Sequence, residues 1–264
     1  MRGTLLCTFF FVHLGVLGQF TLQEPFDECG VTGSITIYDV QRKLWMTNDI
    51  KDSQHATLPA STFKIVNSLI AFETGTVRDE YEIIPWIDDY DTLRYGNRPE
   101  IYRDMNLEDA FKQSAVWVYV EVAKKIGKER YRDWLTRIGY GNVDVSIDDP
   151  DFWNFGDMAI SPVNQIEILK GIYEEIFPFS KRSYALLKKM MIAEKTEDYT
   201  IWAKTGWTGK DGKDIGWWVG YVERGGDLYF FATRLTKDRS ESNPRFGSCR
   251  KEITKKVFKE LGLL

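Results

Sequence analysis

The stretch from residue 59 to residue 75 places the tightest constraint on how this chain can fold. A helix that is apolar on every side is normally enclosed inside a domain, so the rest of the chain must cover such a segment. Gly75 follows at the position where a glycine in the left-handed conformation closes a helix. We therefore expect a central buried helix that ends at Gly75, and its apolar side chains are Phe63, Ile65, Val66, Leu69, Ile70 and Phe72.

Two reactive polar groups lie at the entrance of this helix, Ser61 and Lys64. Because they are three residues apart, both side chains point to the same side of the first turn. A serine hydroxyl beside a half-buried amine can act as a nucleophile and its base. A Ser-x-x-Lys pair also arises about once by chance in a chain of this length, and a second pair, Ser248 and Lys251, lies in a polar segment typical of a solvated helix start. The catalytic interpretation therefore needs support from other segments.

The first residues have the pattern of a secretory signal. Arg2 supplies the positive charge, residues 5–17 form a short apolar run, and Gly18 is a small residue suited to cleavage. The run is too short to span a bilayer, and no later run reaches the ~18 apolar residues of a membrane helix. We expect cleavage after Gly18, a periplasmic or secreted protein and no stable membrane anchor. The alternative is a buried N-terminal strand or helix.

Histidine is scarce, which limits the chemistry available. Of the two histidines, His13 would leave with the signal and His55 lies in a polar loop. A zinc hydrolase usually presents two or three histidine ligands, so we expect no metal site. A Ser-His-Asp enzyme would need His55 as its base, and we interpret His55 instead as an exposed loop residue. If Ser61 is a nucleophile, lysine is then the candidate base.

The remaining cysteines and the net charge bear on disulfide bonding and on nucleic-acid binding. Cys7 would leave with the signal, and in an exported protein Cys29 and Cys249 can pair. The sequence does not place their Cα atoms within bonding range, so the pairing stays open. The net charge is −4 and there is no basic block, so we expect no nucleic-acid partner.

The order of predicted elements indicates an α+β fold. Two strands come first, then the buried helix and a helical block, then three strands and a last helix, which favours one antiparallel β-sheet flanked by helices. We expect a single domain over residues 19–264, with a mostly helical subdomain at about 78–195 and the sheet in the remainder. Alternation and turn residues predict strands at 34–38, 43–47, 199–206, 216–222 and 228–235, and a final helix at 248–261.

Several loops and helix ends can also be predicted. The segment 107–126 forms either one helix or two helices with a break near Ser114. Ser161, followed by proline, begins a helix that should reach about residue 176. Further helices are expected at 128–138 and about 180–192, and loops at 78–103, 148–157 and 207–214.

Three short motifs then resemble a known family. Serine β-lactamases and penicillin-binding proteins carry Ser-x-x-Lys, Ser-Asp-Asn and Lys-Thr-Gly. The chain has the first at Ser61 and the last at Lys204-Thr205-Gly206, whereas the middle motif is Ser114-Ala115-Val116. That Ser-x-Val form resembles the class D (oxacillinase-type) β-lactamases over roughly residues 25–264. Further similar segments are Tyr140-Gly141-Asn142, Phe152-Trp153, residues 216–220 and Arg250.

The resemblance implies an activity and a role for each matching residue. Ser61 would be acylated by a β-lactam antibiotic and then released by water, which confers resistance. Ser114 would relay a proton to the leaving nitrogen, and the oxyanion would lie between the backbone N–H groups of Ser61 and Trp207. The residues implied in substrate binding are Lys204, Thr205, Gly206, Trp207 and Arg250. The plainer interpretations are an edge-strand charge for Lys204, a surface charge for Arg250 and a structural turn for residues 140–142.

Lys64 would have an unusual environment. With Phe63, Val116 and Trp153 around it, the amine would be poorly solvated, which lowers the pKa of a lysine. A neutral amine can react with carbon dioxide, and the matching lysine of class D enzymes is N-carboxylated. The resemblance therefore implies a covalent carbamate on Lys64 as general base, held by the indole N–H of Trp153, with no separate cofactor.

Two other functions fit the same motifs. One is a non-hydrolytic penicillin-sensing domain, and the other is a penicillin-binding transpeptidase. A short cleavable signal favours a free enzyme over either of them. The expected partners are small-molecule β-lactams, and the protein is expected to be a monomer or a homodimer.

Overall fold

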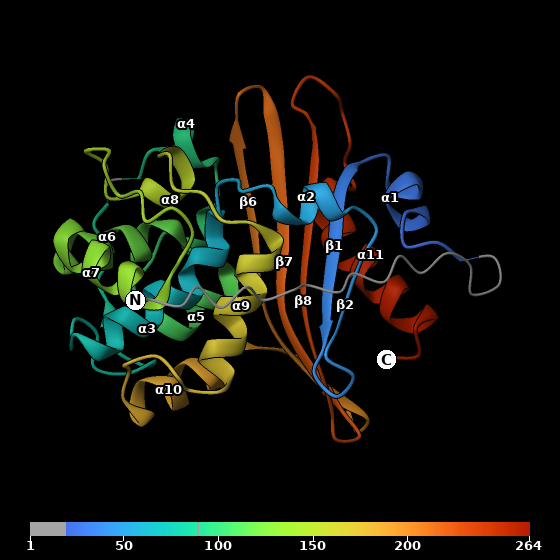
Figure 1. The fold of residues 1–264 in the computed structure, drawn as a ribbon. Coiled ribbons are helices and arrows are strands. Elements are labelled where there is room, and N and C mark those ends of the chain that lie inside the picture. The colour runs from blue at the N-terminus through green and yellow to red at the C-terminus, as the bar shows by residue number, and fades with distance from the viewer. Residues whose placement is uncertain (1–19, 89) are drawn as a thin grey trace, which may run out of the picture.

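A six-stranded antiparallel sheet forms the centre of the protein (Figure 1). The computed structural model describes residues 20–88 and 90–264, so the expected signal at 1–18 lies outside the described residues. The strand order is β2-β1-β8-β7-β6-β5. The α+β fold predicted from the sequence is confirmed. The strands are β1 (Thr32–Asp39), β2 (Leu44–Thr47), β5 (Ile192–Lys195), β6 (Tyr199–Lys210), β7 (Lys213–Arg224) and β8 (Asp227–Asp238).

The early hairpin joins the late one, as expected, through β1 and β8, where Ile35 pairs with Thr233. One loop prediction is wrong. The segment 207–214, expected as a loop, is mostly strand, because β6 and β7 stay paired to their ends and only Asp211 and Gly212 turn the chain. Both turn residues have positive φ, 51° and 74°, as in the two-residue turns that match the twist of a hairpin. β5 was not predicted, and it covers the outer edge of β6.

Helices cover both faces of the sheet. Helix α9 contacts β1, β7 and β8 on one face and α11 contacts β7 and β8 on the other, while the other large helices gather beside α9 (Figure 1). None of the described helices is long and apolar enough to cross a membrane. The longer helices are α3 (Lys64–Glu73), α5 (Leu107–Gln113), α6 (Val116–Ile126), α7 (Lys128–Ile138), α9 (Pro162–Tyr173), α10 (Lys181–Met191) and α11 (Phe246–Glu260).

Short elements complete the chain. They are the helices α1 (Glu24–Cys29), α2 (Ile50–Gln54), α4 (Thr92–Tyr95) and α8 (Phe152–Phe155), two 3-10 helices (Ala60–Phe63 and Pro99–Ile101), and the two-stranded sheet of β3 (Ile83–Ile84) and β4 (Met105–Asn106).

The buried helix has the predicted position and end. All residues of α3 except the last are buried, and Gly75 adopts the left-handed conformation with φ of 68°. The segment 107–126 is two helices, because Ser114 is left-handed and ends α5. Helix α9 ends at Tyr173, before the predicted residue 176, and a left-handed Glu175 follows it.

A disulfide between Cys29 and Cys249 answers the question that the sequence left open. The two Cα atoms are 6.1 Å apart, within the usual range. The bond ties α1 to the start of α11, and both helices cover a second apolar core on the outer face of the sheet. The helix that carries Arg250 is therefore fixed to the N-terminal segment.

Candidate active site

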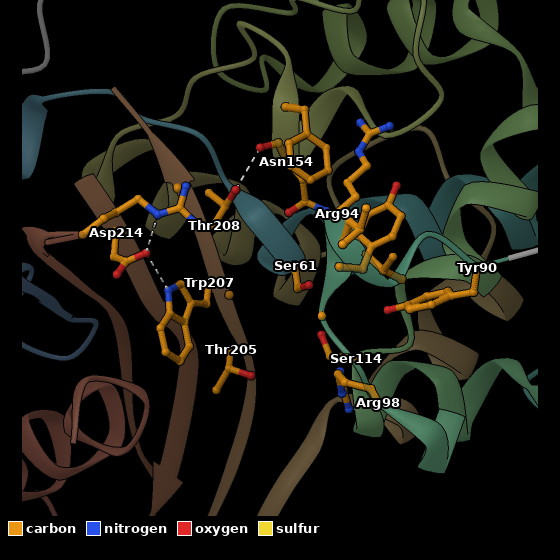
Figure 2. A pocket seen from close by; sticks show the side chains of 18 of the residues that line it. Ser61, Tyr90, Arg94, Arg98, Ser114, Asn154, Thr205, Trp207, Thr208 and Asp214 are labelled. Atoms are coloured by element: carbon orange, nitrogen blue, oxygen red, sulfur yellow. Dashed lines mark hydrogen bonds and ion pairs between the residues drawn. The ribbon is translucent and has the colours of Figure 1, made fainter. Parts of the chain in front are cut away.

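A cavity of about 520 Å³ opens where the end of β6 faces the break between α5 and α6. Ser61 lies at its centre, with Ser114 on one side and Thr205 and Trp207 on the other (Figure 2). The structure therefore brings the three motifs together from distant parts of the chain. Of the residues singled out in the sequence, the cavity is lined by Ser61, Ser114, Val116, Thr205, Gly206, Trp207 and Arg250.

Ser61 and Lys64 form a direct pair. The Nζ of Lys64 donates a hydrogen bond of 2.8 Å to the Oγ of Ser61. The lysine is fully buried, and burial lowers the pKa of Lys64 far below that of a free lysine. The negative charge of Asp151 opposes this shift, whereas the positive charge of Arg98 adds to it. The amine can therefore be neutral near neutral pH and accept a proton from the hydroxyl.

The backbone around Ser61 is tightly placed. Ala60 has φ of 51°, a left-handed conformation that costs a non-glycine residue roughly 1–2 kcal/mol. A Cβ atom built on Gly206 would lie 3.0 Å from the carbonyl oxygen of Pro59 and 3.2 Å from the backbone nitrogen of Ser61. Strand β6 thus passes Ser61 at a distance that a glycine permits and a larger residue would disturb.

Ser114 and Lys204 form a second serine–lysine pair. The left-handed turn at Ser114 interrupts the two helices, and the Nζ of Lys204 donates to its Oγ at 3.1 Å. The pairing of β5 with β6 ends at Trp202, but the Lys204 side chain is buried, so it is not an exposed charge. Burial lowers the pKa of Lys204 well below its usual value, and the nearby charges of Lys64 and Arg250 lower it further.

Arg250 reaches the cavity from α11. Its Nη1 donates to the carbonyl oxygen of Gly206 at 2.6 Å, and its Nε donates to that of Gly247 at 2.8 Å. Burial lowers the pKa of Arg250 to about 10, which leaves it charged at neutral pH. It is therefore a half-buried cation at the β6 wall of the cavity, held by two backbone carbonyls, and not a free surface charge.

An aromatic cluster borders the Ser61–Lys64 pair. The ring of Phe63 stacks on that of Trp153, with centroids 5.4 Å apart. Trp153 is fully buried, and its Nε1–H has no hydrogen-bond partner among the residues that the structure describes. Buried donors are nearly always satisfied, so this indole is suited to an added acceptor group. Val116 adds an apolar wall.

The sequence reasoning missed a buried carboxyl group near this pair. Asp151 is fully buried, and the Nδ2 of Asn154 donates to both of its oxygens at 2.8 and 3.1 Å. Burial raises the pKa of Asp151. No pattern separates it from neighbours such as Asp148 and Asp149, so the sequence offered no signal for it.

The short helix α8, within the segment expected as a loop, is anchored to the sheet and to the turn at 140–142. The Oγ1 of Thr208 donates to the carbonyl oxygen of Asn154 at 2.8 Å. The Nδ2 of Asn142 donates to the carbonyl oxygen of Asp157 at 2.8 Å, and its Oδ1 accepts from the N–H of Ala159 at 2.9 Å. These contacts support the structural interpretation of residues 140–142. They also hold the segment that carries Trp153.

Comparison with known proteins agrees with this geometry. The penicillin binding protein transpeptidase domain family matches residues 32–259. The β-lactamase OXA-48 of Klebsiella pneumoniae is 37% identical over 235 residues, which cover 89% of this chain and 85% of that protein. The β-lactamase OXA-2 of Salmonella typhimurium is 36% identical over 232 residues, covering 87% and 81%.

Similar solved structures indicate which class of β-lactamase the chain resembles. A class D β-lactamase from Sebaldella termitidis superposes with a TM-score of 0.87 and is 41% identical, covering 92% of this chain and 96% of that one. FUS-1 (OXA-85), a class D β-lactamase from Fusobacterium nucleatum subsp. polymorphum, gives 0.84 and 30% identity, covering 92% and 98%. The chain belongs to the class D β-lactamases of the penicillin-binding transpeptidase superfamily.

Proposed function

We propose that this protein hydrolyses β-lactam antibiotics through an acyl-enzyme on Ser61 and so confers resistance to them. The enzyme is a class D serine β-lactamase, an amide hydrolase that acts on cyclic amides. The observation that carries the proposal is the 2.8 Å hydrogen bond between the Nζ of a fully buried Lys64 and the Oγ of Ser61. A buried amine with a lowered pKa is a base at neutral pH, and the serine is then an activated nucleophile.

The remaining residues have distinct roles in acylation. As the Oγ of Ser61 attacks the lactam carbonyl, its proton passes to the base at Lys64. The backbone N–H groups of Ser61 and Trp207 stabilise the oxyanion, and losing one such donor typically costs about 10²–10³ in rate. The hydroxyl of Ser114, which accepts from Lys204, delivers a proton to the leaving nitrogen.

The substrate's own carboxylate binds on the β6 side of the cavity. Thr205 and Gly206 line this wall, and Arg250 supplies a half-buried positive charge next to Gly206. Once the substrate carboxylate is bound, Lys204 takes up a proton and adds a second positive charge. A guanidinium and a hydroxyl suit a carboxylate, because charge-assisted hydrogen bonds are stronger than neutral ones.

The surroundings of Lys64 fit a carbamate formed with carbon dioxide. Trp153 has a buried, unpartnered N–H among the described residues, and Phe63 and Val116 keep the amine poorly solvated. A carbamate bound there supplies a general base for both acylation and deacylation. Lys64 would carry it and Trp153 would orient it, so the proposed chemistry uses carbon dioxide as its one added group and no metal.

We further propose that the protein is exported. The pattern of Arg2 and residues 5–17 supports a signal peptide with cleavage after Gly18, and the enzyme would then act in the periplasm or outside the cell. The mature chain, 19–264, is proposed as a single domain with a helical subdomain at about 78–195. Its state is proposed as monomer or homodimer.

Turnover of a chromogenic cephalosporin or penicillin tests the activity. We expect many turnovers per wild-type molecule, and a loss of about 10²–10⁴-fold in Lys64→Ala, because the general base is removed. Lys124→Ala, at an exposed lysine paired with Glu121, is the matched control and should retain full activity. A single stoichiometric burst from the wild type would identify a sensor or transpeptidase instead, and near-normal turnover by Lys64→Ala would disprove the base assignment.

Bicarbonate tests the carbamate separately. Removing bicarbonate at low pH should depress activity, because protonation and loss of carbon dioxide both oppose the modified lysine. Adding bicarbonate should restore activity. An enzyme that is insensitive to bicarbonate would retain the Ser61 mechanism without the carbamate.

A further inference from the structure

Asn154 lines the same cavity as Ser61, and the chemistry proposed above gives its side chain no role. It lies in the short helix α8, directly after Trp153, and only 5% of its surface is exposed. Its backbone carbonyl oxygen accepts a hydrogen bond from the Oγ1 of Thr208, so the residue is tied to β6. Figure 2 shows Asn154 on the cavity wall beside Thr208, above Ser61 in that view.

The amide group of Asn154 has a fixed orientation. Its Nδ2 donates to both carboxyl oxygens of the fully buried Asp151, at 2.8 and 3.1 Å. A carboxylate only accepts hydrogen bonds, so the nitrogen end of the amide faces Asp151 and the oxygen end points elsewhere. None of the residues that the structure describes donates to the Oδ1 of Asn154, and this oxygen is not among the fully enclosed polar atoms without a partner. The Oδ1 is therefore a free acceptor that is open to the cavity.

The pair of Asp151 and Asn154 belongs to the surroundings of the base. The charge of Asp151 acts on Lys64, where it opposes the lowering of the lysine pKa. Trp153, whose indole N–H is suited to an acceptor group on Lys64, directly precedes Asn154 in the chain. Val116 also borders this part of the cavity, but its side chain is apolar and offers no acceptor. Asn154 thus supplies an acceptor where the cavity meets the surroundings of Lys64.

Hydrolysis of the acyl-enzyme needs a water molecule held by two acceptors. The water oxygen bonds to the ester carbonyl carbon on Ser61 while one of its protons passes to the base at Lys64. The bond from that carbon to the Oγ of Ser61 then breaks, and the proton passes from the base to the Oγ. The second hydrogen of the water needs an acceptor that keeps the oxygen aimed at the carbonyl, because reactivity depends strongly on this alignment.

We propose that Asn154 is a positioning residue for the water that hydrolyses the Ser61 acyl-enzyme. Its Oδ1 accepts the second hydrogen of the water, and Asp151 holds the amide in the orientation that this requires. The inference rests on the proposed β-lactamase function. Because acylation does not use this water, Asn154 acts on deacylation and not on the attack of Ser61 on the antibiotic.

The variant Asn154→Leu removes the acceptor at a similar side-chain volume. The acyl-enzyme formed with benzylpenicillin, followed by intact-mass spectrometry, should decay about 5–10-fold more slowly, the size expected when one hydrogen bond is lost. The value of kcat/KM reports the steps up to acylation and should change less than about threefold. A purely structural defect would lower kcat/KM as well.

Methanol as a competing nucleophile gives a second readout. Methanol has a single O–H hydrogen, which passes to the base, so it does not need the second acceptor. The ratio of methyl ester to acid formed from the same acyl-enzyme should therefore rise about 5–10-fold in Asn154→Leu. Gln54→Leu removes an exposed amide outside the cavity lining and should leave this ratio and both rates unchanged.

The outcomes separate the possible failures. An unchanged product ratio, or a loss in kcat/KM equal to the loss in deacylation rate, would overturn the proposal, because Asn154 would then only support the fold. If Asn154→Leu does not fold because Asp151 loses its partner, the double variant Asp151→Leu/Asn154→Leu removes both partners and gives the same product-ratio test. A wild type that does not turn over benzylpenicillin would refute the proposed function and this inference with it, a result distinct from an unchanged ratio.

Discussion

Breaking the disulfide between Cys29 and Cys249 should cost the protein a large part of its stability. The two residues are 220 positions apart, so the bond closes nearly the whole domain into one loop. The loop-closure model assigns about 5 kcal/mol to a loop of this length, and measured values for disulfides are typically ~2–4 kcal/mol. At 2–4 °C per kcal/mol for a domain of this size, Tm should fall by roughly 5–15 °C.

Urea unfolding followed by tryptophan fluorescence measures the effect in the double variant Cys29→Ser/Cys249→Ser. Because the mature chain would contain no other cysteine, reductant should shift the unfolding curve of the wild type and leave the variant unchanged. Equal unfolding free energies for oxidised wild type and variant would refute the reasoning. Turnover at 25 °C should change less than about threefold, because hydrogen bonds to Gly206 and Gly247 also hold Arg250, the neighbour of Cys249.

Two further changes test the geometry and the electrostatics of the site. Gly206→Ala would place a Cβ 3.0 Å from the carbonyl oxygen of Pro59, so β6 must shift away from Ser61. We expect kcat/KM to fall about 10–10²-fold with little change in Tm. Unchanged kinetics would show that β6 is not closely fitted against Ser61. Burial lowers the pKa of Lys64, so activity should decline as the pH falls through that lowered pKa and the amine becomes protonated. The free energy of unfolding should rise with pH between the lowered pKa and the usual lysine pKa, because in that range the unfolded chain binds a proton that the folded chain does not. A pH–activity profile and urea titrations from pH 5 to 10 measure both trends, and in Lys64→Met the pH dependence of stability should be weaker.

The sheet and the central helix could be predicted because their signals are local. Alternating side chains mark β1, and Arg224-Gly225-Gly226-Asp227 marks the turn between β7 and β8. The apolar faces of α3 indicate that the helix is buried, and the glycine after it indicates where the helix ends. The tip of the β6–β7 hairpin was mistaken for a loop because its residues are polar, and the pairing that extends the strands is not a property of one segment.

The candidate-site residues that lie in motifs could be predicted from the sequence, and those that only the fold brings near the cavity could not. Ser61, Ser114 and Lys204 carry recognisable neighbours in sequence. Asp151 does not, because its importance comes from its burial and from its proximity to Lys64, which lies far away in the sequence. The disulfide is a similar case, since its two cysteines lie at opposite ends of the chain and the sequence alone does not give their distance.

The two serine–lysine pairs lie beside the β6 wall that is proposed to bind the substrate carboxylate. Lys64 and Lys204 are both buried, burial lowers the pKa of each, and the charge of Lys64 lowers the pKa of Lys204 further. Adding a proton to either amine is therefore unfavourable while the cavity holds no anion. A substrate carboxylate beside Lys204 and Arg250 reverses this balance, because an opposite charge at short range stabilises the ammonium form. Binding would then convert Lys204 into a cation next to Ser114, so that the proton needed by the leaving nitrogen becomes available when the substrate is in place.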